Sequence, residues 1–233
     1  MIEMKTIEPA RHGWQGMIDI PGDKSISHRS VMFAGLGDTP VHINNFLHAA
    51  DCLSTVGVMR SLGTAIEFLN ENELIVTGKG LHGLSEPMNV LDAGNSGTTL
   101  RLMMGVLAPQ SFLSTFSGDA SLTRRPMRRV LLPLSEMGAR IYGRNANNNL
   151  PLVVVPIGGK LRGIHYKSPV ASAQVKSAIL LAGLYADAPT TVTEPYVSRN
   201  HTEQMLAGFG VRIERSGTSV TVFPVEDGGY RAP

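Results

Sequence analysis

The fold of this 233-residue chain is decided by residues 95–107, NSGTTLRLMMGVL, which join a polar head to an apolar body. Ser96 and Thr98 are residue types that favour the N-terminal cap and first turn of a helix. The residues that follow are apolar on most faces of a helix, and a helix that is apolar all round is buried. We therefore predict a buried helix that begins close to the start of this segment.

Two other segments share this design and make it a repeat. Residues 24–36 read KSISHRSVMFAGL, and residues 172–184 read SAQVKSAILLAGL. Each of the three segments is followed by a strand-like stretch, a second helix that ends at a glycine, and two more strand-like stretches. The closing glycines are Gly63, Gly138 and Gly210, and a helix C′ position favours glycine because the backbone there is left-handed.

This repeat predicts an α/β (α+β) domain made of three βαβαββ-type units, at about residues 21–85, 86–160 and 161–227. Apolar and polar residues alternate at 191–193 and at 220–222, as expected of strands. We expect the three apolar helices to pack in the middle, with the sheets outside. If the units are related by approximate threefold symmetry, the helix N-termini emerge on one face.

Composition excludes several classes of protein. Hydrophobic residues make up 42% of the chain, which is enough for a packed core. Charged residues make up 17%, which is too few for a disordered chain. The net charge of +2 argues against a broad nucleic-acid surface. We expect no membrane span and, without an apolar signal-peptide core, a cytoplasmic location. Cys52 is the one cysteine, predicted to be a buried thiol, and the seven histidines lack metal-ligand spacing.

The three predicted helix starts also suggest an anion site. A helix N-terminus carries free N–H groups and about half a positive charge, so converging N-termini attract anions. Each start alone is better explained as an ordinary cap, but three in register, together with basic residues, favour a site. Those basic residues are Lys24, Arg29, Arg101, Arg124 and Arg125. Of these, Arg101 is expected to make a structural ion pair on a buried helix.

Four motifs in order resemble those of EPSP synthases, the 3-phosphoshikimate 1-carboxyvinyltransferases, over essentially the whole chain. They are PGDKSISHR at 21–29, LDAGNSGTTLR at 91–101, GDASLTRRPM at 118–127 and SAQVKS at 172–177. The resemblance implies one domain of the enolpyruvyl transferase fold. It also implies transfer of the enolpyruvyl group of phosphoenolpyruvate to shikimate 3-phosphate, in the shikimate pathway to chorismate and aromatic amino acids, with no metal or cofactor.

The resemblance assigns roles to ten residues. Lys24 matches the lysine between the two substrates and is the one catalytic candidate. The residues implied for shikimate 3-phosphate are Lys24, Ser25, Arg29, Ser172, Ala173, Gln174 and Arg199. Those implied for phosphoenolpyruvate are Lys24, Asn95, Gly97, Arg125 and Gln174. Ala173 stands where some members have serine, so only its backbone N–H is expected to contribute. Gly97 matches the small residue of glyphosate-sensitive members, which implies a sensitive enzyme.

The resemblance further implies a two-domain, monomeric enzyme about twice this length. Residues 1–20 would belong to the other domain and residues 21–233 would form the N-terminal domain, while the C-terminal domain is absent from this chain. The missing half would supply further proton-handling carboxylates and a lysine, so this chain alone is expected to be inactive. Two alternatives stay open: a UDP-N-acetylglucosamine enolpyruvyl transferase domain, which normally has a reactive loop cysteine, and a non-catalytic phosphate-binding module.

Overall fold

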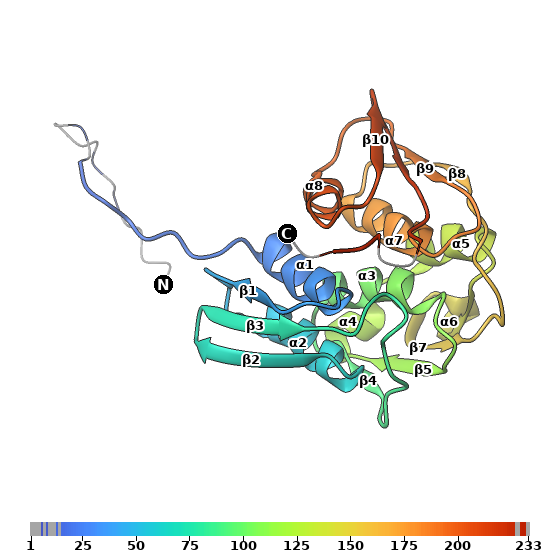
Figure 1. Ribbon diagram of the computed structural model, residues 1–233, viewed down its shortest axis with the longest axis horizontal. Helices are drawn as coiled ribbons and strands as arrows, with labels where there is room; N and C mark the ends of the chain where they lie inside the picture. Colours follow the sequence, from blue (N-terminus) through green and yellow to red (C-terminus); the bar gives the residue numbers. More distant parts are fainter. Residues whose placement is uncertain (1–5, 7, 9–12, 14, 227–228, 232–233) are drawn as a thin grey trace.

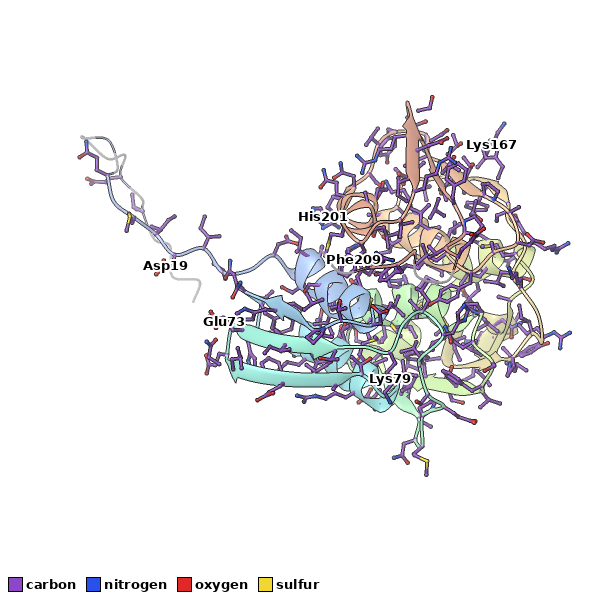
Figure 2. All side chains as sticks on the ribbon, viewed as in Figure 1. Asp19, Glu73, Lys79, Lys167, His201 and Phe209 are labelled. Atoms are coloured by element: carbon purple, nitrogen blue, oxygen red, sulfur yellow. The ribbon has the colours of Figure 1, made fainter. Side chains whose placement is uncertain are left out.

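The computed structural model describes residues 6, 8, 13, 15–226 and 229–231. The expectation that residues 1–20 belong to another domain falls largely outside this described part. Residues 15–20 are described, and they are exposed and without regular secondary structure. In Figures 1 and 2 they run away from the body of the molecule, and Asp19 marks their position.

Three helices lie in the middle of the molecule: α1 (Lys24–Gly35), α3 (Gly97–Leu107) and α7 (Ala173–Gly183) (Figure 1). A side-chain oxygen caps each one by accepting a backbone N–H three residues on. The capping residues are Asp23, Ser96 and Ser172, so the cap of α1 is Asp23 rather than the hydroxyl residues that follow it. This arrangement confirms the predicted buried helices and their polar starts.

Glycine allows α3 and α7 to approach closely. A Cβ atom on Gly105 would lie 2.1 Å from the backbone oxygen of Ala178, so no larger residue fits there without moving a helix. The side chains of Leu102, Met103 and Leu180 are fully buried around this crossing. The crossing therefore brings the two helices together along their apolar faces.

Three small sheets surround the helices. In the first, the strand order is β1 (Val41–Ile43), β3 (Glu73–Thr77), β2 (Ala65–Asn70). In the second it is β4 (Leu91–Asp92), β5 (Ser114–Ser117), β7 (Asn149–Val155), β6 (Arg140–Gly143). In the third it is β8 (His165–Lys167), β9 (Thr190–Thr193), β11 (Ser219–Val222), β10 (Ile213–Ser216).

The sheets are built alike, with one difference. In the second and third sheets a leading strand pairs in parallel with the next: β4 with β5, and β8 with β9. The remaining pairs in all three sheets are antiparallel. In the first sheet, among the residues that the structure describes, no such leading strand accompanies β1, whose outer edge is free. Within its described residues, the first unit thus lacks the leading strand of the βαβαββ pattern.

The second helices of the three units are α2 (Ala50–Ser61), α5 (Arg128–Glu136) and α8 (His201–Gly208). The closing glycines follow them as predicted, with φ angles of 90° at Gly63, 97° at Gly138 and 82° at Gly210. In Figure 2, His201 marks the beginning of α8, and Phe209 marks the residue that follows its end. Phe209 packs edge-on against Phe33 of α1, with ring centroids 6.2 Å apart. The second helices therefore cover the central ones.

The middle unit contains two extra short helices, α4 (Ala120–Arg124) and α6 (Arg144–Asn147). Arg125 lies between α4 and α5 with extended backbone (φ −73°, ψ 135°). A proline disfavours the helical conformation of the residue before it, and Pro126 follows Arg125. The break in the helix therefore releases Arg125 from a helical position.

Candidate functional site

The starts of the three central helices meet at a small hollow. Its lining residues come from α1, α3, α7 and the segment before and into α8: Ser25, Arg29, Thr98, Ala173, Gln174, Arg199 and His201. The expected convergence of the helix starts on one mouth is thus observed. Each start contributes free N–H groups and a partial positive charge.

Arg29 is the buried cation of this hollow, with 4% of its surface exposed. Its guanidinium donates to the Thr202 hydroxyl at 2.7 Å, the Ser25 carbonyl at 2.8 Å and the Ser177 hydroxyl at 2.8 Å. Burial, aided by repulsion from Arg199, lowers the pKa of Arg29 to about 10. None of the ion pairs among the described residues involves Arg29, so its charge is available to an anionic ligand.

Arg199 lies at the rim of the same hollow. Its Nη1 donates to the Ser25 hydroxyl at 3.0 Å, which links the segment before α8 to the first turn of α1. Two cations and a hydroxyl therefore face one small space. An arginine pair of this kind suits a phosphate or a carboxylate, which can accept two parallel bonds from one guanidinium.

Gln174 joins this hollow to a second group of residues around α3. Its Oε1 accepts from Arg101 Nη1 at 2.9 Å, and its Nε2 donates to the Thr98 hydroxyl at 3.0 Å. The first turn of α7 is thereby tied to the first two turns of α3. Ala173, the preceding residue, contributes its backbone at the start of α7.

Gly97 lies between two guanidinium groups. A Cβ atom at this position would be 2.6 Å from Nη1 of Arg101 and 3.4 Å from Nη1 of Arg125. The predicted structural ion pair of Arg101 is wrong, because its hydrogen-bond partner is Gln174 and none of the ion pairs of the described residues includes it. Burial, with Arg125 and Arg129 nearby, lowers the pKa of Arg101.

Asn95 holds Arg125 in place beside Gly97. Its Oδ1 accepts from Arg125 Nη2, and its Nδ2 donates to Asp119 at 2.5 Å. Asp119 also caps α4 by accepting from the N–H of Leu122 at 2.7 Å. Backbone and side-chain hydrogen bonds from Leu122 and Asn95 lower the pKa of Asp119. Because the Asp119 carboxylate is already engaged by these donors, the guanidinium of Arg125 can bind a further anion.

Lys24 is not among the residues that line this hollow, although its neighbour Ser25 is. Its ammonium group pairs with Asp51 in the first turn of α2 and stays half-exposed. Asp51 therefore holds the one predicted catalytic residue in place. Any ligand that uses Lys24 therefore competes with this exposed ion pair, which is a weak competitor because it is solvated.

An uncharged network lies behind the starts of α1 and α3. His28 Nδ1 is 2.6 Å from the Thr55 hydroxyl, which is 2.7 Å from the Thr99 hydroxyl. Thr99 in turn donates to the Ser96 hydroxyl at 2.7 Å. Burial, the largest effect, lowers the pKa of His28 to about 4, so this histidine is neutral at pH 7.

A charged network lies behind the start of α7. Lys176 Nζ is 2.9 Å from Glu194 Oε2 and 2.8 Å from Glu203 Oε1, and all three side chains are almost completely buried. Burial alone would raise the pKa of Glu194, but hydrogen bonds from Lys176, Ser198 and Ser172 outweigh it, so the pKa is lowered. The backbone N–H of Ser172, the cap of α7, donates to Glu194 Oε1 at 2.8 Å, which ties this cap to the network.

The remaining candidate features are the single cysteine, a metal site and a membrane-spanning helix. Cys52 is fully buried, and burial raises the pKa of its thiol to about 11, as expected of a packing residue. Within the described part of the chain, no three His, Cys, Asp or Glu side chains gather closely enough to hold a metal ion. In that same part, no helix combines the length and the apolar character needed to cross a bilayer.

Sequence reasoning missed several residues at the site. Thr98, which lies inside the second motif, and His201, two residues after Arg199, both line the hollow. The Lys176, Glu194 and Glu203 network was not foreseen either. A lysine on an otherwise apolar helix was its visible signal, since lysine is almost never fully buried unless it is paired.

The sequence of this chain is similar to that of a known protein family. The family model described as EPSP synthase (3-phosphoshikimate 1-carboxyvinyltransferase) matches residues 10–232. Proteins named 3-phosphoshikimate 1-carboxyvinyltransferase from Bacillus cereus (strain AH187) and Bacillus anthracis (strain A0248) are 55% identical over 216 residues. That alignment covers 93% of this chain and 50% of each relative. The chain thus spans about half the length of these curated relatives.

A solved structure gives the same result for the fold. The EPSP synthase from Acinetobacter baumannii matches with a TM-score of 0.89 and 43% sequence identity. The match covers 93% of this chain and 48% of that chain. The α/β fold predicted from the repeat is therefore confirmed.

Proposed function

Because this chain belongs to the EPSP synthase family, we propose that it forms one wall of an active site that transfers the enolpyruvyl group of phosphoenolpyruvate to shikimate 3-phosphate. The observation that carries the proposal is the position of Gln174. It bridges an arginine-lined hollow at α1 and α7 and an arginine-flanked glycine at α3. Two adjacent cation-rich subsites suit two anionic substrates.

The two subsites divide the substrates between them. Arg29, Arg199 and Ser25 are proposed to hold shikimate 3-phosphate, together with the start of α7 at Ser172 and Ala173. Asn95, Gly97 and Arg125 are proposed to hold phosphoenolpyruvate, with Gln174 touching both. The backbone N–H of Gly97 can approach a phosphate because no Cβ intervenes.

The proposed reaction is an addition followed by an elimination. The 5-hydroxyl oxygen of shikimate 3-phosphate bonds to C2 of phosphoenolpyruvate and gives up its proton, while C3 gains a proton. C3 then loses a proton, the C2–O bond to phosphate breaks, and the enol ether double bond re-forms. Preorganised cations and helix N-termini stabilise the anionic groups around the cationic character at C2. Lys24 is the group here that can lie between the two substrates and move a proton.

The remaining carboxylates near the site are engaged, which supports a division of labour between two halves. Asp51 is paired with Lys24, and both glutamates behind α7 are paired with Lys176. We propose that another domain supplies the other acid and base groups, and that residues 1–20 pack with that domain. Monomeric assembly, cytoplasmic location, inhibition by glyphosate and the lack of nucleic-acid or membrane partners stay predictions.

Calorimetric titration of the chain with shikimate 3-phosphate tests the proposal. We expect measurable binding without turnover, and binding about tenfold weaker for Arg199→Ala, which loses one charge-assisted contact. The matched control is Arg212→Ala, an exposed arginine that pairs with Glu214 away from the hollow. Equal affinity of all three proteins, or turnover by the purified chain, contradicts the proposal.

The transferase acting on UDP-N-acetylglucosamine is the second candidate, and the burial of Cys52 disfavours it. A reactive cysteine on a mobile loop has no counterpart at this fully buried thiol. Titration with UDP-N-acetylglucosamine under the same conditions distinguishes the two functions, and tighter binding of the nucleotide sugar than of shikimate 3-phosphate supports the alternative.

A further inference from the structure

Three buried ionisable side chains directly behind the hollow have no part in the proposed chemistry. Lys176, Glu194 and Glu203 are 2%, 3% and 1% exposed, and the lysine bridges the two carboxylates. Burying charges is unfavourable, and a packed apolar replacement is often at least as stable as a buried ion cluster. Stability alone therefore does not explain the Lys176–Glu194–Glu203 cluster.

Glu194 connects two parts of the hollow. Its Oε1 accepts the backbone N–H of Ser172 at 2.8 Å, at the cap of α7. Its Oε2 accepts from the hydroxyl of Ser198 at 2.7 Å and from its backbone N–H at 3.4 Å. Ser198 immediately precedes Arg199. One carboxylate therefore holds both the start of α7 and the backbone that carries Arg199.

The bond between Lys176 and Glu203 holds the other arginine. Ser177 follows Lys176 and Thr202 precedes Glu203, and the two hydroxyls of these neighbours are 2.6 Å apart. Both hydroxyls accept from the guanidinium of Arg29, at 2.8 Å and 2.7 Å. Pairing the lysine with Glu203 thus keeps α7 and α8 at the separation that Arg29 requires.

The charges of the cluster also match its surroundings. Two carboxylates and one lysine sum to one negative charge, next to two arginines that repel each other. Repulsion by Arg199 contributes to the lowered pKa of Arg29, whereas Glu203 acts in the opposite direction. Glu203, the second carboxylate of the cluster, therefore stabilises the positive charge of Arg29 and offsets its repulsion from Arg199.

We propose that Lys176, Glu194 and Glu203 are positioning residues, which fix Arg29 and Arg199 at a set separation before a phosphorylated anion binds. The cluster acts through the arginines and does not touch the ligand. This inference rests on the proposed function only in taking the hollow to be a phosphate-ester site. Preorganised donors of this kind lower the ordering entropy that binding would otherwise lose.

The first arm of the test needs no ligand. In Glu194→Gln and Glu203→Gln, side-chain NMR should show faster exchange of the Arg29 Nε–H, and amide exchange should accelerate at Ser172 and Ser198 in the Glu194 variant. The matched control is Val222→Ala, which opens a cavity in the same unit at a fully buried site. Arginine and amide signals that stay as in the wild type in both glutamate variants overturn the inference, as does equal loss of protection in the control.

The second arm measures affinity for inorganic phosphate and for shikimate 3-phosphate, well below each variant's unfolding temperature. We expect the glutamate variants to bind both about tenfold more weakly, the effect of one misplaced charge-assisted contact, and the valine variant to bind within about twofold of wild type. If a single variant fails to fold, Lys176→Met/Glu194→Gln/Glu203→Gln replaces it, because removing all three charges leaves none uncompensated.

The two arms separate this inference from the proposed function. Restrained arginines that are released only in the cluster variants, in a protein that binds neither phosphate compound, support the positioning role and contradict the proposed function. Wild-type affinity for shikimate 3-phosphate in every cluster variant, with unchanged arginine signals, leaves the proposed function standing and overturns the positioning role.

Discussion

The polar groups behind the start of α3 are uncharged, whereas those behind the start of α7 are ionised. His28, Thr55 and Thr99 pass hydrogen bonds from α1 through α2 to α3 without a net charge. On the other side, Lys176 and two glutamates join α7 to α8. Both networks fix helix starts at the same mouth, so the difference shows two ways to hold an anion site rigid.

The two networks differ in what happens when one member is lost. A neutral network that loses a partner leaves one unsatisfied donor or acceptor, at a penalty of about 1–3 kcal/mol. An ion cluster that loses a partner leaves a buried charge, and the penalty is larger. Stability measurements on single variants can therefore sharpen or break the comparison.

Lys176→Met should have the largest effect on stability. It leaves Glu194 and Glu203 as neighbouring buried carboxylates without their counterion, so we expect a loss of about 3–5 kcal/mol in the free energy of unfolding. Urea denaturation at pH 7 measures it. The variant should regain stability as the pH falls, since protonating a glutamate removes an uncompensated charge; a loss below about 1 kcal/mol at pH 7 contradicts the contrast.

Lowering the pH should have the second-largest effect on stability, through the uncharged network that contains His28. The pKa of His28 is about 4 in the folded protein, below its usual 6.5, so the unfolded state binds a proton first as the pH falls. The contribution of neutral His28 is complete above pH 6.5 and is lost between pH 6.5 and 4, for a total of about 3 kcal/mol. Denaturation across this range, with His28→Gln as the comparison, measures it; an equally steep slope in both proteins is the contrary outcome.

Thr55→Val should be milder than either. The change keeps the shape of the side chain and removes the hydroxyl shared by His28 and Thr99. We expect a loss of about 1–2 kcal/mol, because two buried groups must find other partners. Thermal or urea unfolding gives the number, and a loss that equals that of Lys176→Met shows that charge is not what distinguishes the two networks.

Gly97→Ala should change stability least while altering binding. The new methyl group would lie 2.6 Å from the end of the Arg101 side chain, which can shift, so the free energy of unfolding should change by less than about 1 kcal/mol. Titration with phosphoenolpyruvate in the presence of shikimate 3-phosphate should show about tenfold weaker binding, because the methyl group occupies the approach to the helix start. Unchanged affinity removes Gly97 from the proposed subsite.

The sequence predicted the helices and turns that carry the site better than the hydrogen bonds that connect its side chains. The polar starts of the three buried helices and the closing glycines follow from local chemistry, so residues such as Ser96 and Gly138 are visible as signals. The bonds that fix the arginines are not local: Arg29 and Thr202 are 173 positions apart. Arg101 was misread for the same reason, since its partner Gln174 lies on another helix.

The helix break at Arg125, between α4 and α5, is partly visible in the sequence. Pro126 is visible in the sequence and disfavours a helix at the preceding residue, and Arg125 has an extended backbone in the structure. The leading strands β4 and β8 are short and take their identity from pairing with β5 and β9, so the pattern of residues alone does not delimit them. Tertiary contacts decide such elements.

Among the residues that the structure describes, no strand pairs with the outer edge of β1, and this has a practical consequence for concentrated solutions of the protein. Beside that edge runs a largely apolar groove of about 370 Å³, lined in part by Ile26, Ile43 and Phe209. Backbone groups left unpaired on a sheet edge adhere to any extended chain that reaches them. Concentrated samples should thus form oligomers that dissociate on dilution, and His42→Lys, which places a charge at the exposed middle residue of β1 beside the groove, should prevent them.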